Sequence, residues 1–223
     1  MNPERLEIFI ITYNRCLYLE HTLQSIFDEK CPIRNYPITI LDNNSTDGKG
    51  KLCIEFASKY PNLTYIKNHR NVGLPGNICK AMEFASREYF WILCDNDELD
   101  FSAWPEVEKA MDEKKDLILA AIDYFDPKKE KECFEALVLN QLTFLPAGIY
   151  RTEHLTDNVM SYAVADTYTV LPHLPLGCAI INKKGKIAKL TKGIVTLTDN
   201  VKIEKLRRYD FDRIKPDPFI KKK

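Results

Sequence analysis

The chain has 223 residues, enough for one α/β domain and too few for two large ones. Hydrophobic residues make up 45% and charged residues 29%, a globular balance that excludes a disordered, collagenous or coiled-coil protein. No window approaches the ~20 apolar residues that a membrane-spanning helix needs. Residues 1–7 carry both charge signs and no secretory signal, which predicts a cytoplasmic protein.

Charge is balanced overall but uneven along the chain. There are 32 Lys and Arg and 32 Asp and Glu, which argues against nucleic acid as the main partner. Residues 183–223, however, carry 14 basic and 5 acidic side chains, which leaves an acidic body and a basic tail. Such a tail could hold the protein peripherally at the inner, anionic face of a membrane. A solvated tail that only aids solubility is an equally good interpretation.

The cysteines give no sign of a metal or redox motif. There are seven, an odd number, and no C-x-x-C pair occurs among them. Those at 53, 79 and 94 fall inside apolar patterns, where a cysteine is usually a small buried hydrophobe. A reducing compartment is the simplest account of this usage.

Strand and helix patterns alternate through the first half of the chain. Apolar, β-branched runs predict strands at residues 8–11, 38–41, 63–66, 90–93 and 117–122. Apolar residues at helical spacing predict helices at residues 19–27, 52–57 and 78–85, and another that opens near Ser102. This order predicts an α/β fold with a mostly parallel sheet, helices on its faces and right-handed crossovers.

The regular alternation of strand and helix patterns ends at about residue 124. A charged loop at 126–132 is followed by less regular apolar pieces at 134–139, 145–150, 162–170 and 178–181. No Gly/Ser-rich linker separates the two halves. We therefore expect one continuous domain with two lobes, residues 1–125 and a smaller mixed lobe, residues 126–223, that includes the basic tail.

Ligands of open α/β sheets bind at the carboxyl ends of the strands, so the loops there are the places to look for a site. Polar residues follow the second, third and fourth predicted strands. The sharpest feature is Asp95-Asn96-Asp97, whose two carboxylates are alternate residues and can face one ligand. Paired carboxylates suit Mg²⁺ or Mn²⁺, which usually share their ligands with phosphates. An acidic turn that caps the next helix fits the spacing equally well.

Other residues in these loops could contact a nucleotide. Asp42 could accept hydrogen bonds from a ribose or base, or it could form an Asx-turn. Gly73 and Gly76 would let backbone approach a ligand. Arg15 could balance a pyrophosphate, although a lone arginine is more often a surface charge.

Two enzyme classes are excluded by missing motifs. There is no G-x-S-x-G elbow of a serine hydrolase and no G-x-x-x-x-G-K-[ST] phosphate loop. The four histidines show no metal-ligand spacing.

Taken together, four loop motifs resemble family 2 glycosyltransferases with the GT-A nucleotide-sugar fold. They are IFIITYNR at 8–15, ILDNNSTDG at 40–48, NVGLPGN at 71–77 and LCDND at 93–97. The resemblance covers about residues 6–125. Residues 171–174, LPHL, are faintly similar to abequosyltransferase-like members.

The resemblance implies transfer of a sugar, with inversion, from a nucleotide diphosphate donor to a glycan or lipid-linked acceptor. It implies dependence on Mg²⁺ or Mn²⁺ and a role in bacterial surface polysaccharide or lipopolysaccharide biosynthesis. Asp97 would bind the metal, Asp95 the ribose and metal, and Asp42 the base. The full set of implied donor-binding residues is Thr12, Tyr13, Arg15, Asp42, Asn71, Gly73, Asn77 and Asp95. The family usually carries an arginine before the residue equivalent to Asn77, and Gly76 stands there instead.

Inverting transfer also needs a carboxylate base for the acceptor hydroxyl, which the family places in its variable half. The candidates are Asp157, Asp166 and Asp199, and we favour Asp166 because it lies between apolar stretches. Two alternatives remain at this point. One is a nucleotide-sugar-binding module without catalysis. The other is a nucleotidyltransferase, which would need a glycine-rich, basic loop in place of residues 12–15.

Overall fold

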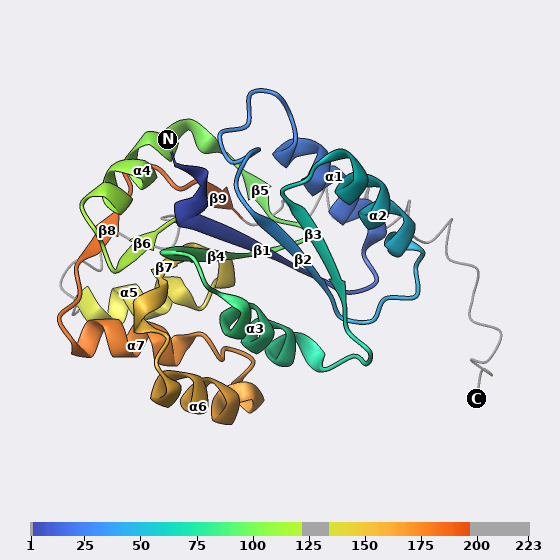
Figure 1. The fold of residues 1–223 in the computed structure, drawn as a ribbon. Helices are drawn as coiled ribbons and strands as arrows, with labels where there is room; N and C mark the ends of the chain where they lie inside the picture. The colour runs from blue at the N-terminus through green and yellow to red at the C-terminus, as the bar shows by residue number, and fades with distance from the viewer. Residues whose placement is uncertain (1, 122–133, 197–223) are drawn as a thin grey trace.

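Seven strands form one central sheet in the computed structural model, which describes residues 2–121 and 134–196 (Figure 1). Their order is β3-β2-β1-β4-β7-β6-β8. All neighbouring strands are parallel except β7, which runs antiparallel to β4 and to β6. The strands are β1 (Leu6–Thr12), β2 (Ile38–Asp42), β3 (Leu63–Lys67), β4 (Tyr89–Cys94), β6 (Leu117–Leu119), β7 (Gly148–Arg151) and β8 (Ile187–Lys189).

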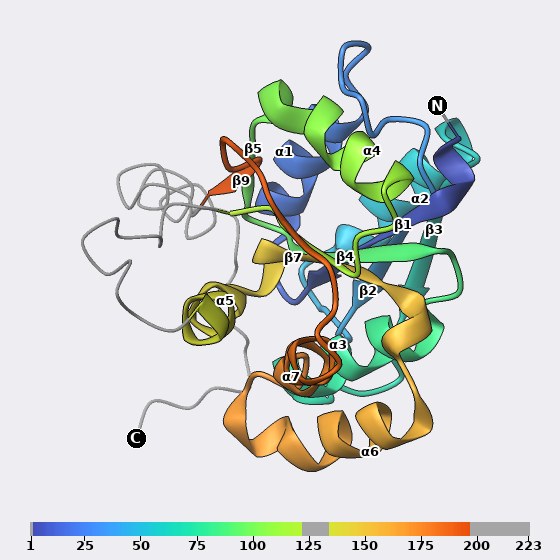
Figure 2. The ribbon, with the colours of Figure 1, turned by 90° about the vertical axis from the view of Figure 1, so that its left-hand side faces the viewer.

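Helices cover both faces of the sheet (Figures 1 and 2). One face is covered by α1 (Cys16–Ile26), α2 (Lys49–Lys59) and α4 (Trp104–Asp112). The other is covered by α3 (Gly73–Phe84), α5 (Phe134–Leu142), α6 (Asp157–Ala165) and α7 (Leu174–Asn182). Short 3₁₀ turns are η1 (Pro3–Arg5), η2 (Phe101–Ala103), η4 (Leu145–Ala147), η5 (Thr152–His154) and η6 (Asp166–Thr169).

The position of the sheet between two layers of helices explains why its central strands are long apolar runs. Alternate side chains of a strand point to opposite faces, and in β1 Ile8 and Ile10 enter one core while Phe9 and Ile11 enter the other. Every residue of β1 is buried. A strand between two helical layers has no solvent-exposed face, so its side chains are mostly apolar on both sides. The exception near the start of β1, Glu7, is buried and accepts from the Ser86 and Arg87 amides.

The predicted α/β fold is confirmed, with differences in detail. The helix expected near Ser102 begins as the 3₁₀ turn η2, and Pro105 lies in the first turn of α4. The strand expected at 117–122 ends at Leu119. The irregular pieces after residue 134 resolve into helices, 3₁₀ turns and β7, and β7 inserts between β4 and β6. The charged loop at 126–132 and the basic residues from 197 onward lie outside the described residues.

A second, two-stranded sheet joins early and late parts of the chain. In it β5 (Glu98–Leu99) pairs antiparallel with β9 (Val195–Thr196). The Asp100 amide also donates to the Ile194 carbonyl at 2.9 Å. The segment that directly follows Asp97 is therefore held in place by residues almost a hundred positions later.

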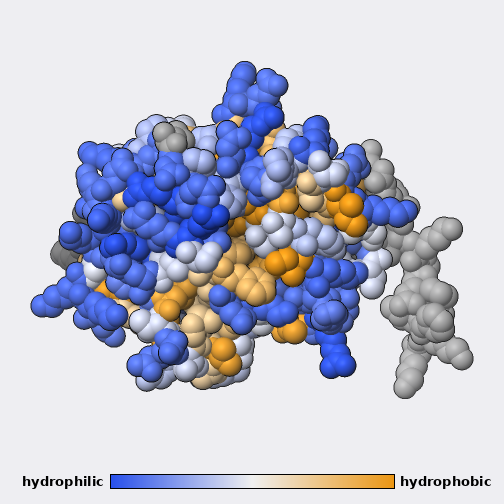
Figure 3. All heavy atoms as spheres, in the orientation of Figure 1, coloured by the Kyte–Doolittle hydropathy of each residue, from blue (hydrophilic) through white to orange (hydrophobic). Residues whose placement is uncertain are grey.

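The surface is mixed in character. Hydrophilic residues dominate around α4, whereas apolar residues emerge in the middle and lower parts of the face in Figure 3. Exposed apolar side chains include Ile54 on α2, Phe84 at the end of α3 and Tyr162 on α6. Within residues 2–121 and 134–196, no helix has the length and apolar character needed to cross a bilayer.

Candidate functional site

A pocket of about 310 Å³ opens at the carboxyl ends of β1 and β4. It lies where the strand order reverses, since β2 is on one side of β1 and β4 on the other. Seven of the eight predicted donor-binding residues line it: Thr12, Tyr13, Arg15, Asn71, Gly73, Asn77 and Asp95. The fold thus brings three of the predicted loops to one place through these residues, and Asn43 adds the loop after β2, while the role of each residue stays a prediction.

Thr12 and Asp95 meet at the base of the pocket. The Thr12 hydroxyl, at the end of β1, donates to Asp95 Oδ2 at 2.5 Å. The same hydroxyl accepts a hydrogen bond from Lys49 Nζ at 2.6 Å. An ammonium only donates, so the single hydroxyl proton of Thr12 must point at Asp95.

Lys49 was not predicted from the sequence. It is the first residue of α2 and only 1% exposed, although lysine is almost never fully buried without a partner. Asp47 Oδ2 lies 3.8 Å from its Nζ. In the sequence, Lys49 stands in a polar, glycine-containing stretch that gives no sign that its side chain is buried. Its burial is visible only in the structure.

Arg15 forms the exposed side of the same cluster. Its Nη1 lies 3.3 Å from Asp95 Oδ1 and 3.0 Å from Asn96 Oδ1. Burial raises the pKa of Asp95, and the Thr12 hydrogen bond and the nearby Arg15 and Lys49 charges oppose that rise. The carboxylate is therefore supported by two cations, one buried and one exposed.

Asp97 folds back on its own loop. Its Oδ2 accepts from the Cys94 amide at 2.7 Å and so closes the turn after β4, whereas the following 3₁₀ turn η2 is capped by Asp100. Burial raises the pKa of Asp97 to about 8, and the nearby Asp95 charge adds to the rise. The neighbouring carboxylates of Asp95 and Asp97 repel each other, and a divalent cation, which prefers oxygen ligands, would offset that repulsion. The donor set therefore fits Mg²⁺ or Mn²⁺.

Asp42 does not line the pocket. Its carboxylate is fully buried and accepts from the Ser45 amide at 3.0 Å and the Ser45 hydroxyl at 2.5 Å on Oδ1. Oδ2 accepts from the Tyr65 hydroxyl at 2.8 Å. Contact with a base would require one of these partners to be exchanged. The neighbouring Asn43, which was not predicted, faces the pocket instead.

Asparagine side chains shape the wall next to α3. Asn43 donates to Asn71 Oδ1 at 2.8 Å and accepts from the Val72 amide at 2.9 Å. Gly73 has a positive φ of 74°, which suits glycine, and begins α3 at the pocket. A Cβ at Gly76 would lie 2.9 Å from the Val72 side chain, so the site has no room for the arginine usual in the family. Helix N-termini favour anions, which suits a phosphate at this wall.

Neither of the two candidate bases that the structure describes, Asp157 and Asp166, lines the pocket. Asp166 begins η6, is half-buried, and is near enough to Cys178 to raise the pKa of that thiol, although burial contributes more. Asp157 is the first residue of α6, and Asp199 lies outside the described residues. Val170, which ends η6, has a φ of 69°, a strained conformation for a β-branched residue.

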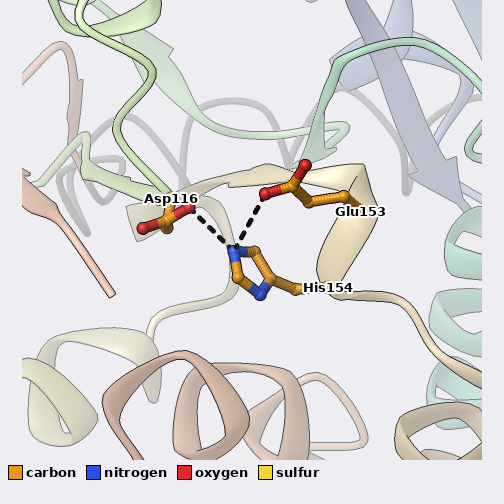
Figure 4. A group of neighbouring side chains, drawn as sticks. All are labelled: Asp116, Glu153 and His154. Atoms are coloured by element: carbon orange, nitrogen blue, oxygen red, sulfur yellow. Dashed lines mark hydrogen bonds and ion pairs between the residues drawn. The ribbon is translucent and has the colours of Figure 1, made fainter. Parts of the chain in front are cut away.

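A different cluster has the composition of a metal site (Figure 4). Asp116, Glu153 and His154 come close together, with His154 Nε2 2.8 Å from Asp116 Oδ1. Asp116 Oδ2 accepts from the Lys186 amide at 2.6 Å, and Arg151 Nη1 lies 2.8 Å from Glu153 Oε1. Burial opposes ionisation of Asp116, but the His154 and Lys186 hydrogen bonds hold its pKa below the usual range.

This cluster is at the wrong end of the sheet for the pocket. Asp116 precedes β6 and therefore lies at the amino ends of the parallel strands, opposite Thr12 and Asp95. Arg151 already pairs with both carboxylates. We interpret the cluster as an ion-pair network that joins β6, β7 and the start of β8.

The sheet, its two helical layers and the pocket at the strand switch point define the GT-A class of nucleotide-binding α/β fold. The model of Glycosyl transferase family 2 matches residues 7–145, and the chain belongs to this family. S. aureus TarS 1-349 has the same fold, with a TM-score of 0.66 at 19% identity over 94% of this chain and 65% of that one. A TarS complex with UDP-GlcNAc matches with a TM-score of 0.64 at 17% identity, over 94% of this chain and 66% of that one. The mannosyltransferase PcManGT from Pyrobaculum calidifontis, in complex with GDP-Man and Mn²⁺, matches with a TM-score of 0.59 at 14% identity. The match covers 94% of this chain and 62% of that one.

Two curated relatives are similar over about half of this chain. The abequosyltransferase RfbV of Salmonella typhimurium is 30% identical over 125 residues, 56% of this chain and 36% of the relative. The minor teichoic acid biosynthesis protein GgaB of Bacillus subtilis is 27% identical over 114 residues, 51% of this chain and 13% of the relative. The matched region thus spans about a third or less of these relatives' own length.

Proposed function

We propose that this protein transfers a sugar from a nucleotide diphosphate donor, with inversion, to a glycan or lipid-linked acceptor in bacterial surface polysaccharide biosynthesis. One observation carries the proposal: seven residues from three separate loops, chosen from the motifs, line a single pocket. The relatives named for abequose transfer and teichoic acid synthesis support the surface-polysaccharide context.

The pocket has the features that a nucleotide diphosphate needs. Tyr13 and Ile11 offer apolar surface for a base or ribose, and Asn43 offers polar atoms. The start of α3 and the Arg15 guanidinium offer positive potential for the two phosphates. Structural neighbours solved with UDP, UDP-GlcNAc and GDP-Man show that this fold accommodates such donors.

Asp95 and Asp97 would hold Mg²⁺ or Mn²⁺. When bound, the ion stabilises the negative charge that develops on the departing diphosphate. Lys49 and Thr12 keep Asp95 in place, and Arg15 adds positive charge at the mouth of the pocket. Mn²⁺ in the PcManGT complex supports the choice of ion.

The acceptor hydroxyl must lose a proton as it attacks the donor sugar, and we assign this task to Asp166. Two observations favour it over Asp157: it is half-buried beside Cys178, and its turn ends in the strained residue Val170. Backbone strain collects at functional sites. Residues 126–223 would then form most of the acceptor side, while residues 1–125 bind the donor.

The basic residues after 183 would place the enzyme peripherally at the cytoplasmic face of a membrane, where lipid-linked acceptors are exposed. Liposome co-sedimentation with rising anionic lipid tests this. Binding should fall with salt and with removal of residues 200–223. Binding that is absent at low salt would leave a protein that meets its acceptor in solution.

Thermal shift with nucleotide sugars, each with Mn²⁺ and with EDTA, tests the proposed function. Stabilisation by a nucleotide diphosphate that depends on the metal, together with release of the free nucleotide on addition of acceptor extracts, supports a transferase. Stabilisation without turnover under any condition would favour a binding module that has lost catalysis. Formation of a new nucleotide sugar from a nucleoside triphosphate and a sugar phosphate would favour a nucleotidyltransferase.

A further inference from the structure

The two oxygens of Asp95 are held very differently. Oδ2 accepts the Thr12 hydroxyl proton at 2.5 Å, and the buried Lys49 ammonium fixes the direction of that proton. A ligand that reached Oδ2 would have to displace this buried hydrogen bond. Oδ1 is bonded instead to Arg15, an exposed residue of the pocket lining.

The Arg15 contact with Oδ1 is weak. Nη1 is 3.3 Å away, which is long for a charge-assisted hydrogen bond. The Arg15 side chain is 51% exposed, whereas that of Asp95 is 3% exposed. Its other contacts are with Asn96 Oδ1, at 3.0 Å, and with the Tyr18 ring, 6.0 Å away. Because half of the arginine is exposed, water can solvate the guanidinium when it leaves, whereas the buried Asp95 carboxylate would need another cation in its place.

Arg15 is also the cationic side chain of the pocket lining. Within the described residues, no lysine and no other arginine lines the pocket, and Gly76 has no room for one. The same guanidinium is therefore the available counter-ion both for Asp95 and for a bound diphosphate. Moving this guanidinium onto a bound diphosphate would draw its Nη1 away from Oδ1, where a divalent cation could take its place.

We propose that Arg15 is an exchangeable counter-ion that competes with the divalent cation for Oδ1 of Asp95 and moves to the diphosphate when the nucleotide binds. This inference rests on the proposed function. A guanidinium and a divalent ion on the same oxygen would repel each other strongly at the low effective dielectric of a half-buried site. The nucleotide removes this competitor, so it tightens metal binding beyond direct chelation, and the metal tightens nucleotide binding equally.

Titration of Mn²⁺, followed by the electron paramagnetic resonance signal of the free ion, tests the exchange without any turnover. In the absence of nucleotide, Arg15→Met should bind Mn²⁺ about tenfold more tightly than the wild type, because the competitor is gone. In EDTA, the same variant should bind the best of UDP, GDP, CDP and dTDP about tenfold more weakly. The gain in Mn²⁺ affinity on adding nucleotide should shrink accordingly.

Two variants control this experiment. Arg87→Met makes the same change in charge at an arginine that pairs with Glu4 near the amino ends of β1 and β4, opposite the pocket, and its Mn²⁺ affinity should match the wild type. Arg15→Lys keeps the charge and should fall between wild type and Arg15→Met. Circular dichroism checks that each variant is folded.

The outcomes separate the inference from the proposed function. Unchanged or weaker Mn²⁺ binding in Arg15→Met, or no Mn²⁺ binding in any variant, overturns the exchange even if the wild type transfers sugar. Tighter Mn²⁺ binding in Arg15→Met supports the exchange. If the wild type then transfers no sugar from any donor, the transferase proposal fails while the competition stands.

Discussion

At the scale of single residues, the site depends on how charges are distributed between buried and exposed positions. Asp95 is supported from behind by Thr12 and Lys49, whereas Asp97 is turned toward the Cys94 amide. The difference suggests different tasks. Asp95 is fixed before any ligand arrives, and Asp97 has one oxygen free of the turn hydrogen bond to accept an ion.

Asp97→Asn should therefore remove most of the metal-dependent function and leave the fold intact. An amide is a poorer ligand for a hard cation, and the site loses one negative charge. We expect kcat/KM to fall by at least about 100-fold, with an unchanged Tm. Asp112→Asn, at an exposed carboxylate at the end of α4, is the matched control and should transfer like the wild type. Full activity in Asp97→Asn would refute the metal site.

Asp166→Asn should lower kcat by about 100-fold or more while the Kd of the donor changes little, because a general base acts on the acceptor in the transition state. Single-turnover kinetics and calorimetric titration of the donor measure the two quantities separately. Asp157→Asn, one helix earlier, is the comparison. If the kcat loss appears in Asp157→Asn or Asp199→Asn and not in Asp166→Asn, the base has been assigned to the wrong carboxylate.

At the scale of elements, the antiparallel strand β7 is the least expected part of the sheet, and its first residue is closely packed. A Cβ on Gly148 would meet the ring of Tyr150, which is fully buried and stacks on Phe90. The first residue of β7 must therefore be glycine for the ring to fit. The strand is only four residues long and bridges β4 to β6.

Gly148→Ala should destabilise the protein by about 2 kcal/mol, because an added methyl group in a close-packed core forces neighbours from their rotamers. Urea denaturation gives the free energy of unfolding. Gly50→Ala is the control, since its Cβ would meet only the Tyr65 hydroxyl at an ordinary 3.5 Å and alanine favours the helix. Gly50→Ala should leave the free energy of unfolding unchanged or raise it slightly. Equal effects of the two substitutions would mean that the Tyr150 ring is free to move.

Particular elements show what sequence patterns can and cannot predict. The first four strands were predictable because strands buried on both faces are long apolar runs in the sequence. The loops that follow them were predictable because ligands bind at the carboxyl ends of parallel strands. The place of β7 was not, because its apolar residues are compatible with several neighbours and only tertiary packing selects β4 and β6. Lys49 and Asn43 were missed for a related reason: a polar residue in a loop shows no periodicity that would report its burial.

At the scale of the whole molecule, one buried histidine links stability to pH. His173 is fully buried between α5 and α7, and its Nε2 donates to the Leu142 carbonyl at 2.6 Å. Its Nδ1 is buried and finds no partner within the described residues. Burial lowers the pKa of His173 to about 4, although the Leu142 hydrogen bond acts in the other direction.

Stability should therefore fall as the pH drops from about 6.5 toward 4. In this window the unfolded chain takes up a proton on His173 that the folded protein refuses, and the loss amounts to about 2 kcal/mol at pH 5. Above pH 6.5 both states are neutral and the effect disappears. Urea denaturation at pH 5 and pH 7 measures it. His173→Gln should reduce the difference between the two pH values, whereas His21→Gln, at an exposed position on α1, should leave it unchanged.

The insertion of β7 also has a consequence for the order in which the nascent chain can fold. The pocket is built from residues 11–95, so the four strands β3-β2-β1-β4 could assemble around it early in synthesis. In the folded protein this edge of β4 pairs with residues 148–151 and not with β6. Until those residues leave the ribosome, more than fifty residues after β4, the nascent protein would carry an unprotected sheet edge beside the pocket residues, and such an edge invites pairing with other chains. A ligand that binds early would stabilise this intermediate. A chaperone that binds exposed strand edges would act on the edge of β4.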